Sequence, residues 1–119
     1  MKRKFRIITV NHKKFAWWCS FNHGTEIHLS PECDKTAVIT VAFPSKVSDD
    51  FYSLFPLFVI MQNQKQICRV KLIEPKMISL FLIYLQNDFQ SRKTLSFDGC
   101  TLLRQMGWHI IQMENGFGW

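Results

Sequence analysis

A cluster of potential metal ligands lies near the N-terminus. Thiolate and imidazole groups are the usual ligands of zinc, and a C-x3-H-x4-H-x4-C pattern brings four of them into one short stretch: Cys19, His23, His28 and Cys33. We expect a hairpin here that pairs Cys19 with His28. The stretch lacks the paired C-x2-C or H-x3-H clips that preorganise zinc sites. The four residues therefore remain candidate ligands, and the sequence predicts neither a bound metal nor a cofactor.

Cys100 is the best candidate for a nucleophile. It is expected in the first turn of a short helix, where the positive end of the helix dipole lowers a thiol pKa. The neighbouring Asp98 would oppose that effect, and a catalytic thiol also needs a base. Only His109 stays open for that role. Because GxGxxG, Walker-type, HExxH and GxSxG motifs are all absent, the sequence favours a non-catalytic protein.

The positive charge of the chain is gathered at its N-terminal end. The net charge is +6. The excess comes from a run without acids, while cations and acids balance from residue 15 onward. Such a patch attracts phosphates or acidic partners. The candidate residues for binding nucleic acid or another anion are Lys2, Lys4, Arg6, Lys13, Lys14 and Trp17.

Trp17 has two alternative roles in that patch. In the expected first hairpin it lies opposite Arg6, on the face shared by Lys2 and Lys4. An exposed Trp17 would stack on the bases of single-stranded nucleic acid. A buried Trp17 would belong to the core, with Arg6 lying over its ring as an ordinary cation–π pair.

Apolar residues occupy both faces of the same hairpin. The chain is 47% hydrophobic and 14% aromatic, with 11 Phe and 4 Trp. One helix can cover only part of one face, and an exposed apolar patch usually marks an interface. A homodimer is the commonest outcome. The two faces are predicted to carry Ile8, Val10, Phe15 and Trp17 on one side, and Phe5, Ile7, Ala16 and Trp18 on the other.

The elements that must position these residues begin with a sheet. Short runs with polar connections predict a four-stranded antiparallel meander. Its strands are expected at 4–10, 15–21, 26–30 and 37–43. Ser48 could cap a helix over 49–55 that ends at Pro56. Two further strands are expected at 57–61 and 67–73.

The second half of the chain is predicted to hold two helices. Pro75 suits a first helical position, and the apolar run after it predicts a buried helix over 75–87. A short helix over 99–106 should be capped by Asp98 and end at Gly107, with Trp108 packing back onto Leu103. A last strand is expected at 108–113. These elements make one α+β domain over 1–119, with an antiparallel sheet of five to seven strands.

The composition also predicts the location and class of the protein. It excludes intrinsic disorder. The apolar stretches are too short for a secretory signal or a membrane span, so we expect a cytoplasmic protein with reduced thiols and no membrane contact. We therefore expect a binding or interaction protein that self-associates through an apolar sheet face. The alternative is a nucleic-acid-binding protein that uses the basic N-terminal hairpin.

Overall fold

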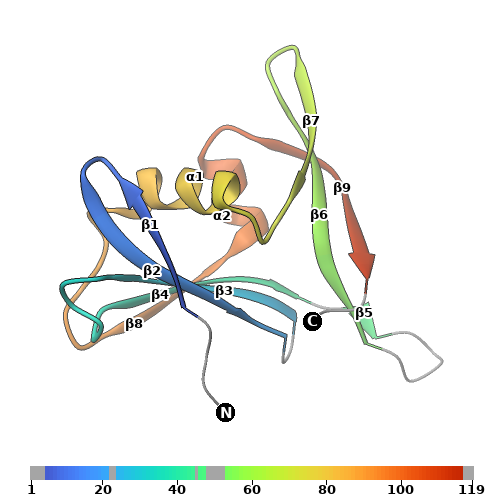
Figure 1. Cartoon of the computed structure of the whole chain (residues 1–119). Helices are drawn as coiled ribbons and strands as arrows, with labels where there is room; N and C mark the ends of the chain where they lie inside the picture. Colours follow the sequence, from blue (N-terminus) through green and yellow to red (C-terminus); the bar gives the residue numbers. More distant parts are fainter. Residues whose placement is uncertain (1–4, 22–23, 45, 48–52, 117–119) are drawn as a thin grey trace.

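The first half of the chain folds into the predicted meander. A computed structural model of the chain describes residues 5–21, 24–44, 46–47 and 53–116. Four strands pair in chain order as antiparallel neighbours, and a fifth, later in the chain, joins the last of them in parallel (Figure 1). We call this five-stranded sheet sheet A. Its strands are β1 (Arg6–Val10), β2 (Lys13–Ser20), β3 (Gly24–Pro31), β4 (Val38–Pro44) and β8 (Thr94–Asp98).

The first hairpin has the predicted register. Asn11 and His12 form the two-residue turn with φ angles of 51° and 65°, as in the type I′ turns that match the twist of paired strands. Arg6 therefore lies opposite Trp17. The expected pairing of Lys4 with Cys19 lies outside the described residues.

The second hairpin differs from its prediction by one residue. Trp18 pairs with His28, and Cys19 pairs with Ile27. The expected pairing of Cys19 with His28 is therefore wrong. Because side chains alternate between faces along a strand, this shift places the two residues on opposite sides of the sheet.

A second sheet, sheet B, is built around the longest strand. β6 lies between β7 and β9, and the short β5 pairs with its beginning. Its β6–β7 hairpin agrees with the two strands predicted there, and β9 with the predicted last strand. The bounds are β5 (Lys46–Val47), β6 (Ser53–Asn63), β7 (Gln66–Lys71) and β9 (His109–Gly116).

The helix predicted over 49–55 is wrong where the structure describes it. Residues 53–55 belong to β6, while Ser48 and residues 49–52 lie outside the described residues. Pairing with β5 and β9 outweighs the local capping signals there. Pro56 does not end the element: it lies beside a register shift between Pro56 and Phe58, where a missing N–H is tolerated.

Both predicted helices of the second half are confirmed. They are α1 (Pro75–Leu85) and α2 (Gly99–Gln105). The Asp98 carboxylate accepts a hydrogen bond from the Thr101 N–H at 2.9 Å. At the other end of α2, Gly107 has a φ of 96° and the Trp108 N–H donates to the Leu103 carbonyl. This is the expected glycine-ended helix.

The core lies between the two sheets and α1. α1 runs beside β1 against the inner face of sheet A, while Ile83 and Tyr84 on its far side are exposed. The helix is thus amphipathic and is not covered on every side. The sheets meet where β6 contacts β3 and β4, and α2 joins β4, β8 and β9 (Figure 1). In the described part of the chain, neither helix is long and apolar enough to cross a membrane.

Candidate functional site

The inner face of the first hairpin is part of the core. Trp17 is only 2% exposed, and the Cζ atom of Arg6 lies 5.3 Å from the centroid of its ring. A buried indole offers no surface to a base. The stacking role proposed for Trp17 is therefore wrong, and the cation–π pair with Arg6 is the arrangement found.

The outer face of the same hairpin carries a row of rings that crosses neighbouring strands. The Phe5 and Trp18 rings meet edge to face at a centroid distance of 5.1 Å. The Trp18 ring stacks on the His28 imidazole at 5.3 Å. Phe5 and Ile7 remain 53% and 55% exposed. We call the surface formed by Phe5, Ile7 and Trp18 the β1 patch.

The backbone beside the β1 patch is also open. β1 stands at one end of sheet A and pairs with β2 alone among the described strands. A two-residue turn makes Val10 and Lys13 a hydrogen-bonded pair, so every second residue of β1 points its N–H and C=O groups toward β2. The N–H and C=O groups of Ile7 and Thr9 consequently point toward the open edge.

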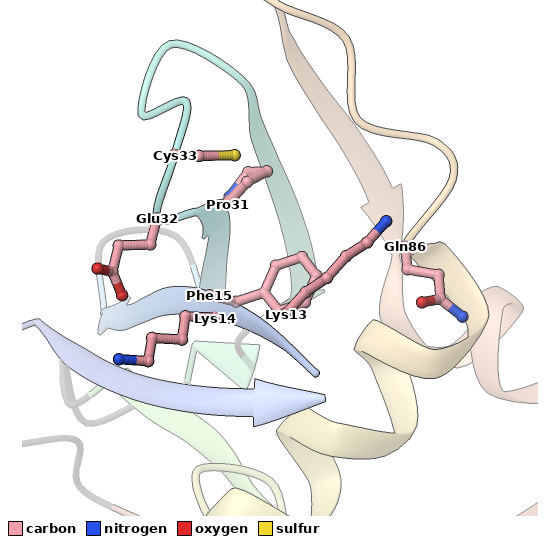
Figure 2. A pocket seen from close by; sticks show the side chains of 7 residues that line it. All are labelled: Lys13, Lys14, Phe15, Pro31, Glu32, Cys33 and Gln86. Atoms are coloured by element: carbon pink, nitrogen blue, oxygen red, sulfur yellow. The ribbon is translucent and has the colours of Figure 1, made fainter. Parts of the chain in front are cut away.

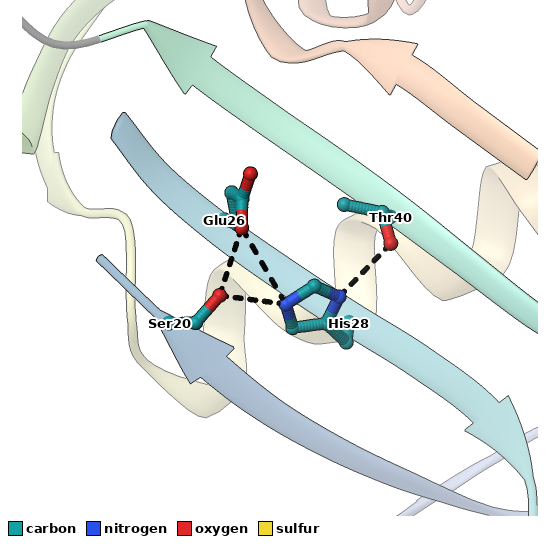
Figure 3. A network of polar contacts seen from close by, with 4 residues as sticks. All are labelled: Ser20, Glu26, His28 and Thr40. Carbon is teal, nitrogen blue, oxygen red and sulfur yellow. Dashed lines mark hydrogen bonds and ion pairs between the residues drawn. The ribbon is translucent and has the colours of Figure 1, made fainter. Parts of the chain in front are cut away.

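A polar network lies next to the row of rings on the outer face (Figure 3). The Ser20 Oγ donates to the Glu26 Oε2 at 2.9 Å and lies 2.8 Å from the His28 Nε2. On the other side of the ring, the His28 Nδ1 lies 2.9 Å from the Thr40 Oγ1. The register of β2, β3 and β4 brings these four side chains together.

The single hydroxyl proton of Ser20 fixes the direction of this network. Since that proton goes to Glu26, the Ser20 Oγ must accept from the His28 Nε2–H. In the neutral ring, the His28 Nδ1 then accepts from the Thr40 hydroxyl. The imidazole is a donor to Ser20 here and is not the base that a nucleophilic serine needs. The network therefore satisfies its own polar groups and anchors three strands of sheet A.

Two of the residues predicted to bind an anion line the same cavity. A pocket of about 510 Å³ lies beside the β1–β2 turn (Figure 2). Lys13 and Lys14 both line it, but Figure 2 shows their side chains leaving β2 in opposite directions. The remaining lining residues are Phe15, Pro31, Glu32, Cys33 and Gln86. Lys2 and Lys4 lie outside the described residues, and Arg6 lies over Trp17.

The candidate metal ligands do not converge. Cys19 and His28 lie on opposite faces of sheet A, while Cys33 is exposed beyond β3. His23 lies outside the described residues. Within the described ranges, no group of three or more histidine, cysteine or acidic side chains could hold an ion.

Cys100 lies in the first turn of α2, as expected, but the environment works against activation. Burial of its side chain is the main factor that raises the pKa of the thiol, and the Asp98 carboxylate raises it further. Arg104 opposes both with a smaller effect. Cys100 borders a cavity of about 410 Å³ that also touches β6 and β9. At neutral pH the thiol is therefore protonated, which disfavours a nucleophilic role.

The sequence did carry a signal for the polar network. Glu26 and His28 stand two residues apart on a strand and must share a face. With the correct register of β2 and β3, Ser20 falls opposite Glu26. The predicted register, shifted by one residue, concealed this arrangement.

No family model, curated protein or solved structure matches the chain.

Proposed function

We propose that the protein is a non-catalytic binding protein that self-associates through β1. Two copies of sheet A would join edge to edge to form a homodimer. The observation that carries this proposal is the coincidence of two open features on one strand. Ile7 combines an apolar side chain that is 55% exposed with backbone N–H and C=O groups that point away from β2.

An exposed apolar edge strand is a template for pairing with another chain. Antiparallel pairing of β1 about a two-fold axis at Ile7 would place Ile7 opposite Ile7 of the partner subunit. Phe5 would then lie opposite Thr9 of the partner subunit. The same contact would satisfy backbone groups and bury apolar side chains, and it is self-complementary, as a two-fold interface requires.

Sedimentation velocity on the full chain tests the homodimer. Ile7→Pro removes only an N–H that faces the open edge, so the β1–β2 ladder keeps its hydrogen bonds. We expect this variant to raise the dimer dissociation constant at least about tenfold, the equivalent of one or two hydrogen bonds. Ile67→Pro on β7 is the control, since Ile67 is 61% exposed on the other sheet.

Ile7→Lys gives a second measurement that does not depend on proline geometry. Its charge would meet the same charge of the partner subunit at the two-fold axis, so the dimer should dissociate. Wild-type protein that stays monomeric at the highest concentration tested contradicts the proposal. So does a dimer that Ile7→Lys leaves intact.

The second candidate function is nucleic-acid binding through the basic hairpin. The row of Phe5, Trp18 and His28 rings on an outer sheet face favours it, because exposed rings on a sheet can stack bases. Lys14 belongs to the same face by alternation along β2. Salt separates the two candidates. Nucleic-acid affinity falls steeply as salt rises, whereas an apolar strand pair resists it.

A further inference from the structure

Sheet B has an open edge along β7. Among the described strands, β7 pairs with β6 alone, and their hairpin projects from the rest of the fold (Figure 1). The register between the two strands is continuous. A strand at the edge of a sheet offers unpaired backbone groups to another chain. The free side of β7 is therefore open to an added strand.

The pairing of β7 with β6 decides which residues face that free side. The Leu72 N–H donates to the Leu57 carbonyl just beyond the end of β7, at 2.8 Å. Because the N–H and C=O groups of alternate residues point to the same side of a strand, every second residue before Leu72 also points toward β6. The residues whose N–H and C=O groups point to the free side are Ile67, Arg69 and Lys71.

These three residues also place their side chains on one face of sheet B, because side chains alternate along a strand. Ile67 is 61% exposed, the highest value among the large apolar side chains of the described residues. Arg69 is held by Glu114, while Lys71 is exposed. The edge therefore presents an apolar side chain and an ammonium group four residues apart on the same face.

The β6–β7 hairpin is a second basic region of the chain. From Ser53 to Ile73 the sequence holds three cations and no acid. Glu114 of β9 pairs with one of these cations, and the other two form no ion pair among the described residues. The three cations are Lys65, Arg69 and Lys71.

These charges disfavour a second copy of the chain at this edge. Two-fold pairing centred on Ile67 would place Lys65 opposite Arg69 of the partner subunit. Centring the pair on Arg69 would place two guanidinium groups opposite each other. Like charges directly opposite destabilise a strand pair. The same charges favour a segment of a different protein that carries acidic side chains.

We propose that the open edge of β7 binds an extended, acidic segment of another protein, which adds to sheet B as an antiparallel strand. An acidic side chain of the segment lies opposite Lys71, and an apolar side chain four residues further along lies opposite Ile67. Backbone pairing supplies affinity, and the alternate side chains supply the preference for acidic segments. The site is separate from the β1 interface, since it belongs to the other sheet.

A matched pair of fluorescently labelled peptides tests the charge requirement. TETETVTE places Glu opposite Lys71 and Val opposite Ile67, and TKTKTVTK differs only in its charged residues. By fluorescence anisotropy at low salt, TETETVTE should bind at least about tenfold more tightly than TKTKTVTK. Lys71→Glu should weaken TETETVTE about tenfold, because an attraction becomes a repulsion of similar size, and should strengthen TKTKTVTK. Lys93→Glu, at an exposed lysine beside sheet A, is the control and should change neither affinity by more than about twofold.

A proline variant and amide exchange test the added strand. Ile67→Pro removes an N–H that faces the free side and keeps every cation, so the affinity for TETETVTE should fall about fivefold, as for loss of one hydrogen bond. Ile7→Pro on β1 is the control and should leave this affinity unchanged. In the wild type, saturating TETETVTE should slow exchange of the outward amides at least about fivefold by NMR, while the amides that already donate to β6 stay as they are. The outward amides are those of Ile67, Arg69 and Lys71.

Three results would overturn the proposal. Equal affinity for the two peptides would show that the edge has no preference for acids. Unchanged exchange of the outward amides at saturating TETETVTE would show that the cations attract the peptide without pairing of backbones. Protection of those amides by a rise in protein concentration alone would show that a second copy occupies the edge.

Discussion

An aromatic side chain is covered on the outer face of sheet B, whereas one is exposed on the outer face of sheet A. On sheet B, Arg69 covers Phe58, with its Cζ 3.8 Å from the ring centroid. Glu114 holds that guanidinium in place: Arg69 Nε donates to Oε1 at 2.6 Å, and Nη2 to Oε2 at 3.3 Å. On sheet A, Phe5 lies more than half exposed, and no cation of the described residues covers its ring.

The register explains this difference. Phe58 pairs with Glu114 on one side, and the neighbouring Ile60 pairs with Arg69 on the other. The acid and the base therefore flank β6 on one face and can close over the ring between them. On sheet A, Arg6 lies on the inner face against Trp17, so it cannot shield Phe5. Among the described residues, a cation covers the aromatic ring Phe58 on one outer face and none covers Phe5 on the other, which is why we propose the interface at β1.

The largest expected effect comes from disturbing the packing of α2 on β4, because α2 contacts strands of both sheets. A Cβ added at Gly99 would collide with the buried ring of Phe43. We expect Gly99→Ala to lower the free energy of unfolding by about 2–3 kcal/mol through overpacking. Gly107→Ala is the control: its Cβ meets nothing within 4 Å, and the cost is only about 1 kcal/mol of backbone strain. Urea unfolding measures both, and equal losses would refute the steric explanation.

A smaller effect is expected from uncovering Phe58. Arg69→Ala removes both the cation–π contact and the ion pair, and we expect a decrease in Tm of about 3 °C at pH 7. The hydrogen bond from Arg69 lowers the pKa of Glu114. The stabilisation is thus present above the ordinary carboxyl range and is lost as pH falls through the lowered pKa. The difference between wild type and variant should therefore shrink as pH falls through the lowered pKa of Glu114, while the part due to the cation–π contact remains.

Lys71→Ala is the matched control for Arg69→Ala. Lys71 lies two residues further along β7, on the same face, and is exposed. Thermal scans at several pH values should show almost no change for this variant. A decrease in Tm as large as that of Arg69→Ala would mean that any cation on this face stabilises the sheet.

The smallest expected effect is a difference between thiols. Burial raises the pKa of both Cys19 and Cys100, whereas Cys33 is exposed. In iodoacetamide labelling followed by mass spectrometry, Cys33 should react first at pH 8. Labelling of Cys100 should still accelerate above about pH 8.5, the usual thiol pKa. A Cys100 rate that levels off below that pH would contradict the raised pKa.

Local signals in the sequence predicted the local features of the fold. The Asn11–His12 turn set the register of the first hairpin, and Asp98 and Gly107 marked both ends of α2. Features that depend on distant pairing were missed. The short run Thr94–Asp98 becomes β8 only because β4 lies beside it. In the same way, residues 53–55 form a strand where capping residues suggested a helix, because Ser53 pairs with Val47 of β5 and Phe55 with Gly116 of β9.

The candidate site could be predicted only in part. The charge run identified Lys13 and Lys14, but the cavity that they line arises where the end of α1 lies beside the hairpin, which no local pattern reports. Trp17 and Trp18 were correctly assigned to opposite faces. Which of them is covered depends on where α1 packs. The polar network was missed because a register shift of one residue exchanges the two faces of a strand.

The parallel pairing of β4 with β8 has a consequence for the order of folding. The two strands are separated by β5, β6, β7 and α1 along the chain, so closing that loop costs more entropy than forming any hairpin of the meander. Contacts of long sequence separation slow folding. During synthesis, the meander is therefore complete before β6 and α1, the elements that cover its apolar inner face, have emerged.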